Sequence, residues 1–422
     1  MGMTNWAVLL LTMLVTGPGQ RRQEVPDDRL YGRVMTAGVD VYQGFLRWDR
    51  NEGSWADVLD GSKEIPWQNV RDAERLDRNW DRRRDRDHSI SILGLRISWD
   101  GDDRDLSSAS SGIRFGHIRR LTVYGNDRAL LELKSGEEVE LEGGSTDLGD
   151  ELRALVVEDA ERGRVTLRWR DLDEVEFMPA PRGMKAPSPL QNRLHGTLVT
   201  RRGMELTGFI AWDMDEILGS DVLDGEERDR DHEIPFHRIA AIERAGSSGA
   251  RVVLANGEEL RLRGSNDVDD SNRGITVSDP GLGQAAVDWD AFDSVRFHPA
   301  PAGTGGYHAF DGGHALWGTV ETEDGERFTG WIRWDNDEEW SWELLDGEQD
   351  EVELDVEFGN IERIARRGSW GSEVVLRDGR TFELEGSNDV DEDNKGIYVT
   401  LEDGETVLVE WWDFREVTFE HP

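Results

Sequence analysis

The sequence predicts an all-β fold built from three tandem repeat units, and two observations carry this prediction. Apolar and polar residues alternate on both sides of Asp-Gly pairs, as in VTLEDGETVLVEW (399–411), which is the signature of antiparallel hairpins. The chain also repeats itself at long range, which marks a multi-unit architecture. Alternation implies one buried face per sheet, so we expect each unit to be a β-sandwich or two small barrels.

Three blocks of sequence recur in the same order in each unit. The opening block carries Trp-Asp, an acid and Leu-Asp-Gly, and its copies are GFLRWDRNEGSWADVLDG (44–61), GFIAWDMDEILGSDVLDG (208–225) and GWIRWDNDEEWSWELLDG (330–347). The second block ends in an acid-rich loop, GSNDVDDSNRGI (264–275) in unit 2 and GSNDVDEDNKGI (386–397) in unit 3. The closing blocks span 167–177, 287–297 and 409–419. We expect the equivalent Trp48, Trp212 and Trp334 in the core, because buried aromatic rings contribute much of the packing energy.

Stretches rich in Pro, Gly and small residues separate the units and are typical of linkers. We expect few contacts to cross them. The predicted segments are a signal peptide (1–19), unit 1 (23–178) with a helical insertion near 67–88, a linker (179–193), unit 2 (194–298), a second linker (299–315) and unit 3 (316–422).

The inserted segment 67–88 contains no Pro or Gly, alternates in charge sign and places apolar residues near helical spacing. The sequence therefore predicts one helix, with seven arginines between Arg71 and Arg86. Such a helix either presents a solvated, salt-bridged face or binds an acidic surface of the protein itself or of a partner.

The amino-terminal sequence predicts export. Trp6 to Val15 is an apolar run too short to span a bilayer, and Gly17 and Gly19 follow it at a suitable cleavage position before Gln20. No Lys or Arg precedes the run, so a buried first strand or helix is the alternative. No other segment reaches membrane-spanning length, and we expect an exported protein, periplasmic or extracellular, without a membrane span.

Composition excludes several classes of function. The formal net charge is −40, and such a surface repels phosphate backbones, so we expect no nucleic-acid partner. The chain has no cysteine, which excludes disulfides, thiolate zinc sites and cysteine nucleophiles. The nine histidines lack the spacing of the common catalytic zinc motifs. Such a surface suits cationic partners, metal ions or a salty medium, and a strongly solvated surface without a ligand is the alternative.

The first halves of the units resemble Sm-like and SH3-like small β-barrels. The resemblance rests on the hairpin VETEDGERFTGWIRWD (320–335) and the later FGNIERI (358–364), and it covers about 45 residues per unit. It implies a barrel fold but no RNA binding, because the basic and aromatic loop residues of Sm-like proteins are not evident. The chain as a whole also resembles exported bacterial repeat proteins of uncharacterised function, which implies no activity.

The repeated loop is a candidate calcium site, since calcium takes oxygen ligands from acidic residues at alternate positions of a flexible loop. The loop departs from an EF-hand, because Ser278 or Thr400 replaces the last glutamate and strands flank it. A polar turn without a ligand is the alternative. The candidate ligands are Asp267, Asp269 and Ser271 in unit 2, and Asp389, Asp391 and Asp393 in unit 3.

The acids of the opening block form a second candidate site, because paired carboxylates can hydrolyse glycosides. Three tandem copies argue against a single catalytic centre, and hairpin ends on a solvated rim are the alternative. These acids are Asp49, Glu52 and Asp60; Asp213, Asp215, Glu216 and Asp224; and Asp335, Asp337, Glu338 and Asp346.

Tryptophan supplies the third candidate site. Trp340, Trp342 and Trp412 have no counterparts in unit 2, and any of them that is exposed marks a ligand face special to unit 3. Core filling is the alternative.

Taken together, these patterns predict an exported, non-catalytic binding or structural protein of the cell envelope or extracellular space, whose partner is a protein or a glycan. One alternative is a calcium-dependent or carbohydrate-binding protein. The second is a glycoside hydrolase that uses the opening-block carboxylates. No cofactor is required beyond a possible calcium ion.

Overall fold

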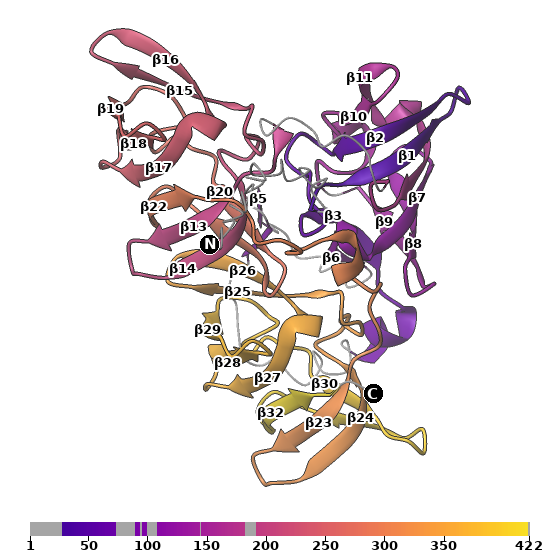
Figure 1. Cartoon of the computed structure of the whole chain (residues 1–422). Helices are drawn as coiled ribbons and strands as arrows, with labels where there is room; N and C mark the ends of the chain where they lie inside the picture. The colour runs from indigo at the N-terminus through magenta and orange to yellow at the C-terminus, as the bar shows by residue number, and fades with distance from the viewer. Residues whose placement is uncertain are drawn as a thin grey trace, which may run out of the picture.

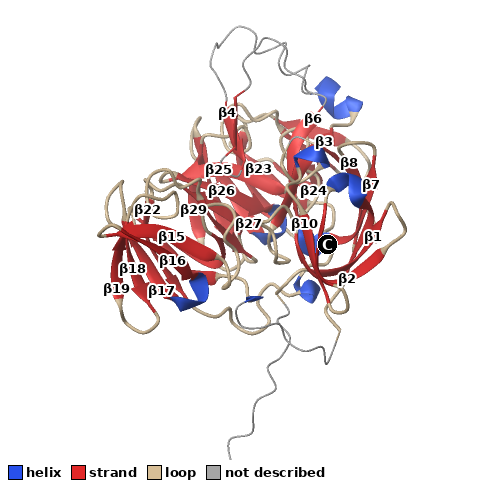
Figure 2. Cartoon of the chain, turned by 90° about the horizontal axis from the view of Figure 1, so that it is seen from above, coloured by secondary structure: helices blue, strands red, loops and turns tan. Residues whose placement is uncertain are grey.

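The computed structural model describes residues 28–72, 89–92, 95–98, 108–143, 145–181 and 191–420. Antiparallel strands dominate these residues, and the helical parts are short 3₁₀ turns and residues 67–72 (Figures 1 and 2). The all-β prediction is confirmed. The rest of the predicted helix, 73–88, and the predicted signal peptide lie outside the described residues. No described helix has both the length and the apolar character needed to cross a lipid bilayer.

Unit 1 contributes the first twelve strands and three 3₁₀ turns. The strands are β1 (Tyr31–Thr36), β2 (Val41–Arg47), β3 (Val58–Glu64), β4 (Ser89–Ile92), β5 (Leu95–Ser98), β6 (Ser108–Arg114), β7 (Ile118–Tyr124), β8 (Arg128–Leu133), β9 (Glu138–Glu142), β10 (Leu155–Asp159), β11 (Gly163–Leu167) and β12 (Leu172–Phe177); the turns are η1 (Phe115–His117), η2 (Gly149–Glu151) and η3 (Trp169–Asp171).

Units 2 and 3 repeat this series, without counterparts of β4 and β5 among the described residues. Unit 2 has β13 (His195–Thr200), β14 (Glu205–Ala211), β15 (Val222–Glu227), β16 (Arg230–Pro235), η5 (Phe236–Arg238), β17 (Ile239–Arg244), β18 (Ala250–Leu254), β19 (Glu259–Leu262), β20 (Ile275–Asp279), β21 (Gly283–Val287) and β22 (Phe292–Phe297). After η6 (Tyr307–Ala309), unit 3 has β23 (Trp317–Thr322), β24 (Arg327–Arg333), β25 (Leu344–Gln349), β26 (Val352–Glu357), η7 (Phe358–Asn360), β27 (Ile361–Arg366), β28 (Gly371–Leu376), β29 (Thr381–Glu385), β30 (Ile397–Thr400), β31 (Thr406–Val409) and β32 (Phe414–Phe419).

One strand order recurs in all three units. It runs β11-β10-β2-β1-β12-β7-β8-β9-β3-β6 in unit 1, and unit 3 repeats it as β31-β30-β24-β23-β32-β27-β28-β29-β25-β26. Unit 2 has the same order through β19, but its β15–β16 hairpin forms a separate two-stranded sheet. Because the first and last strands of each unit pair, for example β1 with β12, each unit ends beside the place where it began.

The three equivalent tryptophans lie in the core, as predicted. Trp48, Trp212 and Trp334 are completely buried. Trp212 meets the Phe292 ring edge-on at 5.3 Å, and Trp334 meets Phe414 in the same way at 5.4 Å. The Trp212 and Trp334 indoles are therefore packed against the closing blocks of their own units, whereas Trp48 packs against Phe115 at 5.8 Å.

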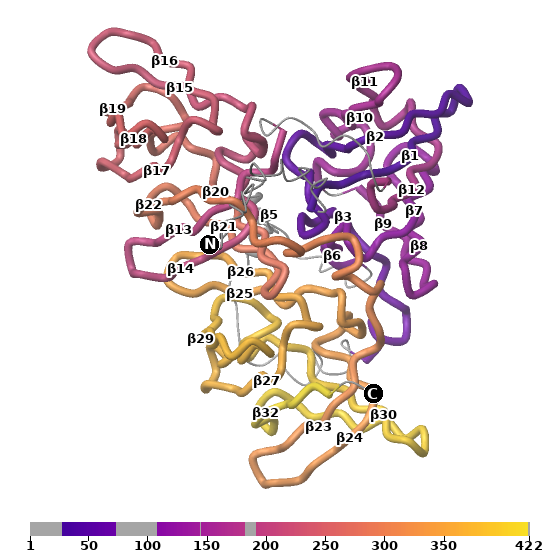
Figure 3. The backbone as a smooth tube through the Cα atoms, viewed as in Figure 1, coloured from indigo at the N-terminus to yellow at the C-terminus, as the bar shows by residue number. Residues whose placement is uncertain are grey.

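The expectation that few contacts cross the linkers is wrong. Strand β21 of unit 2 pairs with β26 of unit 3 from Gly283↔Val356 to Val287↔Val352, so the two units share one sheet. The linker after unit 2 runs towards β6 of unit 1 (Figure 3). There its Phe310 is buried in the core of unit 1. The linker after unit 2 thus packs as part of the structure, which its composition does not reveal.

Arg114, at the end of β6, joins all three units. Its side chain is completely buried, and its Nε donates to Glu357 Oε2 of unit 3 at 2.5 Å. Its Nη1 donates to the Asp279 and Pro280 carbonyl oxygens of unit 2 at 3.2 and 3.1 Å. His117 lies 3.3 Å from the same Glu357 oxygen. A single buried guanidinium therefore contacts all three units, in addition to the β21–β26 pairing and Phe310.

Candidate metal centre

Each site begins at the tight turn of the Trp-Asp-x-x-Glu motif. In unit 2, Trp212 N–H donates to the Glu216 carbonyl oxygen at 2.9 Å, and Glu216 N–H donates back to Trp212 at 3.0 Å. Asp213 and Met214 adopt positive φ angles of 47° and 63°. Aspartate tolerates this left-handed region better than most residues, which explains its place in the motif.

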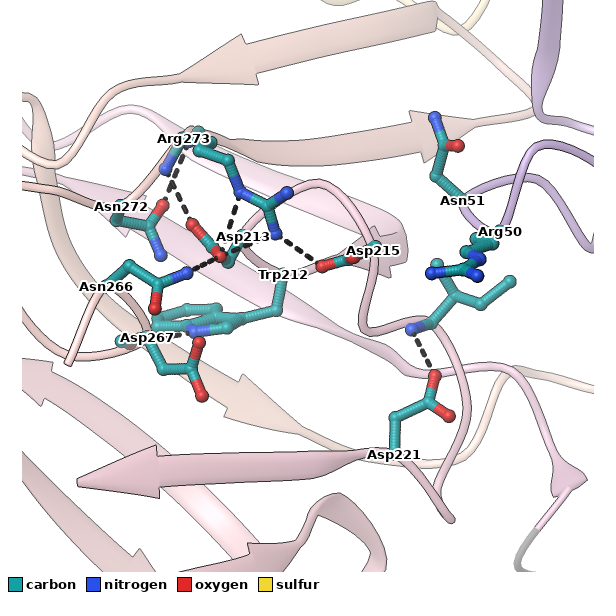
Figure 4. Close-up of polar contacts among 12 residues, drawn as sticks. Arg50, Asn51, Trp212, Asp213, Asp215, Asp221, Asn266, Asp267, Asn272 and Arg273 are labelled. Carbon is teal, nitrogen blue, oxygen red and sulfur yellow. Dashed lines mark hydrogen bonds and ion pairs between the residues drawn. The ribbon is translucent and has the colours of Figure 1, made fainter. Parts of the chain in front are cut away.

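The buried tryptophan connects this turn to the repeated loop. The Trp212 Nε1–H donates to the Asp267 carbonyl oxygen at 2.9 Å, and Trp334 makes the same bond to Asp389 at 2.9 Å. In unit 1, Trp48 donates to Asp147 at 3.0 Å. The indole thus fixes the acidic loop directly beside the turn (Figure 4).

The Leu-Asp-Gly segment orients the loop aspartate. Asp267 Oδ2 accepts the backbone N–H of Asp224 at 2.6 Å, and Asp389 Oδ2 accepts that of Asp346 at 2.9 Å. Such charge-assisted bonds favour one rotamer of the carboxylate.

Three carboxylates converge as a result, and we call each such group an acidic triad. The triads of units 2 and 3 are Asp213, Glu216 and Asp267, and Asp335, Glu338 and Asp389. In each, one oxygen from every residue lies within 4.8 Å of the others. Hard divalent cations, above all calcium, take carboxylate oxygens of this kind as ligands.

The glutamate of each triad has a buried carboxylate oxygen, Oε2, that accepts no hydrogen bond from the described residues. Glu338 is only 8% exposed, and its buried Oε2 has no hydrogen-bond partner among the described residues. Glu216 Oε2 in unit 2 and Glu52 Oε2 in unit 1 share this property. A buried polar oxygen without a partner is costly, so the same orphaned atom in three units points to a ligand.

Burial changes the acidity of the triads. In unit 3, burial and the nearby Asp337 raise the pKa of Asp335 to about 7, and burial holds the pKa of Glu338 well above its ordinary value. Burial likewise raises the pKa of Asp267 to about 6 and that of Glu216 to about 10. Without a counter-ion, Glu216 retains its proton near neutral pH, and Asp335 is partly protonated there.

The units differ in the cation that lies over the first aspartate. In unit 2, the Arg273 guanidinium binds Asp213 and Asp215 (Figure 4). Arg153 binds Asp49 in the same way in unit 1. Unit 3 has Lys395 at this position, and its backbone N–H donates to Asp335. All three triad residues of unit 3 are buried, so this triad has the strongest need for a bound cation.

The other predicted loop ligands do not join the triads. Asp269 Oδ1 accepts the N–H of Ser271 at 3.0 Å, and Asp391 Oδ1 accepts the N–H of Asp393 at 2.8 Å. These bonds shape the loop as local turns. The structure therefore places Asp267 and Asp389 beside acids of the opening block. The other four predicted ligands lie in the loop, outside the triads: Asp269, Ser271, Asp391 and Asp393.

The predicted tryptophans are placed differently from one another. Trp342 is 2% exposed and belongs to the core of unit 1, and Trp340 is half-buried against the same core. Trp412 is 48% exposed. Trp331 and Trp370, which the sequence comparison of units did not single out, are 45% and 64% exposed.

Comparison with known proteins gives no relative from which the role of this site could be inferred. No protein-family model matches the chain, and no curated protein sequence matches it significantly.

Proposed function

We propose that this is an exported, non-catalytic β-repeat protein that binds divalent cations, calcium above all, in the acidic triads of units 2 and 3. The orphaned Oε2 of Glu338, buried beside Asp335 and Asp389, is the observation that carries the proposal. Oxygen donors without sulfur or imidazole suit a hard cation. A bound ion stabilises the folded chain by mass action.

Burial favours ion binding over glycoside hydrolysis. Glu338 is 8% exposed and Asp389 is 5% exposed, so a sugar ring has no approach to a pair of these carboxylates in this conformation. A glycosidase needs its acid and its nucleophile or base on either side of an accessible bond. The repeated triad is instead a buried ligand set in units 2 and 3.

Calorimetric titration of the full chain with calcium tests this function. We expect saturable binding, with the tighter event in unit 3. Glu338→Gln should weaken that event by roughly tenfold or more, because it removes a charged ligand. Glu216→Gln should affect only the weaker event.

Asp393→Asn is the matched control, because it removes a loop carboxylate outside the triad. It should bind calcium as the unaltered chain does. Absence of a binding heat in the unaltered protein, or loss of binding in Asp393→Asn with Glu338→Gln unaffected, would reject the triads as the site.

Export is tested by the amino terminus of the protein purified from its native source. The short apolar run and the small residues after it favour cleavage before Gln20. Edman sequencing should therefore start at or near Gln20. A native protein that starts at Met1 would contradict the proposed export and leave the calcium sites unaffected.

A further inference from the structure

A cavity with a volume of about 230 Å³ lies between units 2 and 3. Unit 2 lines it with the turn residue Met214 and with residues of β20 and β21, and unit 3 lines it with residues of β25 and β26. Strands β21 and β26, where the two units join, lie side by side (Figure 3). None of the lining residues belongs to an acidic triad, so the cavity is a separate feature.

One face of the cavity is a row of side chains that crosses four strands. Thr276 of β20 faces Ala286 of β21. Ala286 in turn faces Glu353 of β26, and Glu353 faces Glu348 of β25. Residues directly opposite one another in antiparallel strands project from the same face of the sheet. The β21–β26 pairing therefore brings two small side chains of unit 2 up to two glutamates of unit 3, and all four line the cavity.

The row leaves space in unit 2 because its side chains there are small. The equivalent positions of unit 3 hold Tyr398 and Leu408, which face each other across β30 and β31. The Arg333 guanidinium lies over the Tyr398 ring, 3.9 Å from its centre. Unit 2 has Thr276 and Ala286 instead. The same row is therefore filled by large side chains in unit 3 and hollow in unit 2.

The lining of the cavity carries four carboxylates. Besides Glu348 and Glu353, these belong to Glu351, in the turn between β25 and β26, and to Asp288, directly after β21. Glu351 binds Arg202 at 2.9 Å, but both side chains are more than half exposed, and such pairs are weak. This local excess of negative charge favours a cationic ligand.

The cavity also lacks a hydrogen-bond donor. Arg273 supplies the one cation among the lining residues, and its guanidinium is held by Asp213 and Asp215 of unit 2. The Oε2 atom of Glu353 is buried and has no hydrogen-bond partner among the described residues. A buried polar oxygen without a donor is costly, and a cationic ligand would bring the donor.

The arrangement suits ammonium groups on an aliphatic chain better than a metal ion or a quaternary ammonium ion. In the described part of the chain, the acids that converge as metal ligands are those of the triads, and the four carboxylates of the cavity do not. None of the lining residues is aromatic, whereas quaternary ammonium ions bind to aromatic faces. Separate carboxylates suit primary ammonium groups, which are compact charges with three donors each. Methylene groups between them would pack on Met214, Ala286 and Val287.

We propose that this cavity binds a linear aliphatic polyamine, with its ammonium groups on Glu353, Glu348 and the neighbouring carboxylates. The volume approaches that of small-molecule sites, which favours a free polyamine. Lysine side chains of another protein share the same chemistry, and a tetralysine peptide distinguishes that source from spermidine. The proposal does not depend on calcium binding, because no carboxylate of the cavity belongs to a triad.

Calorimetric titration of the full chain with spermidine tests the proposal. Salt at about 0.15 M screens the general attraction of polycations to an acidic surface. We expect saturable binding that persists in saturating calcium and exceeds the binding of tetralysine. Glu353→Gln should weaken spermidine binding by roughly tenfold or more, because it removes a charged hydrogen-bond acceptor.

Ala286→Leu separates the shape of the cavity from its charge. It gives unit 2 the side chain that unit 3 carries as Leu408, and it fills the cavity without altering any charge. We expect a loss of spermidine affinity of roughly tenfold or more. Glu258→Gln is the matched control, because it removes an exposed carboxylate in the turn between β18 and β19, outside the cavity. It should bind spermidine as the unaltered chain does. Circular dichroism of each variant ensures that the fold is intact.

Four results would overturn the proposal. The first is no binding of spermidine by the unaltered chain, and the second is unchanged affinity in Ala286→Leu. The third is an equal loss in Glu353→Gln and Glu258→Gln, which would indicate general attraction to the surface. The fourth is a different occupant or site, seen either as tighter binding of tetralysine or as displacement of spermidine by calcium. Calcium binding measured without spermidine shows separately whether the triads are occupied.

Discussion

Arg114→Met is expected to lower the free energy of unfolding by roughly 3–5 kcal/mol, because it leaves a buried carboxylate without its partner. Glu357 is 6% exposed. Burial pushes the pKa of Glu357 upward, but Arg114 and His117 outweigh burial and hold it below its ordinary value. Removal of the guanidinium also takes one donor from each of two carbonyl oxygens of unit 2, which keep their bonds from Leu282 N–H and Asn360 Nδ2. The denaturation midpoint in urea measures the loss.

Two further variants separate this explanation from a general effect of losing an arginine. Arg128→Met breaks a pair with Glu140 in which both side chains are about half exposed, and it should cost at most about 1 kcal/mol. Arg114→Met combined with Glu357→Leu should recover much of the stability, because no unpaired buried charge remains. A double variant no more stable than Arg114→Met alone would contradict the argument.

In EDTA, where no divalent cation is bound, the free energy of unfolding is expected to fall as the pH rises from about 5 to about 8. The pKa of Asp335 is raised from 3.8 to about 7, mainly by burial. The folded state therefore binds protons more tightly than the unfolded state. Its contribution is complete below about pH 4 and is lost as the pH rises through 7, a change worth roughly 4 kcal/mol for Asp335.

Calcium should reduce this fall, because the ion replaces the protons. Melting temperatures in EDTA and in millimolar calcium should therefore diverge more at pH 8 than at pH 5. Some decline should persist in calcium, since Asp355 lies outside the triads and burial raises its pKa to about 8. Asp335→Asn combined with Glu338→Gln should make the pH profile in EDTA less steep, with the contribution of Asp355 remaining. Identical melting curves with and without calcium at pH 8 would contradict the cation sites.

Local patterns in the sequence predicted the β-structure, the repeats and the buried tryptophans, because each depends on nearby residues. The same patterns could not predict that Glu338 meets Asp389. That meeting depends on how the sheet closes and brings the loop under Trp334, whose hydrogen-bond partner lies 55 residues later. The spacing between Trp212 and its loop partner Asp267 in unit 2 is also 55 residues, and this constant spacing is the one sequence signal of the contact.

The sequence also does not predict how the units pack against each other. The residues of the linkers are small, and small residues equally suit a free spacer and a tight contact. Phe310 lies in a Gly-rich stretch, and nothing in that stretch indicates that its ring enters the core of another unit. Likewise, nothing in the sequence distinguishes Arg114 from the other arginines. Only the fold brings it to Glu357 and two carbonyl oxygens.

The pairing of β21 with β26 has a consequence for biosynthesis. A ribosome releases β21 well before β26, and until then the apolar edge formed by Gly283–Val287 has no neighbour on that side. An unpaired strand edge readily recruits edges of other nascent chains. Translation that stalls within unit 3 should therefore produce fragments that aggregate. Unit 3 protects the exposed edge of β21 in unit 2, but only after β26 has been synthesised.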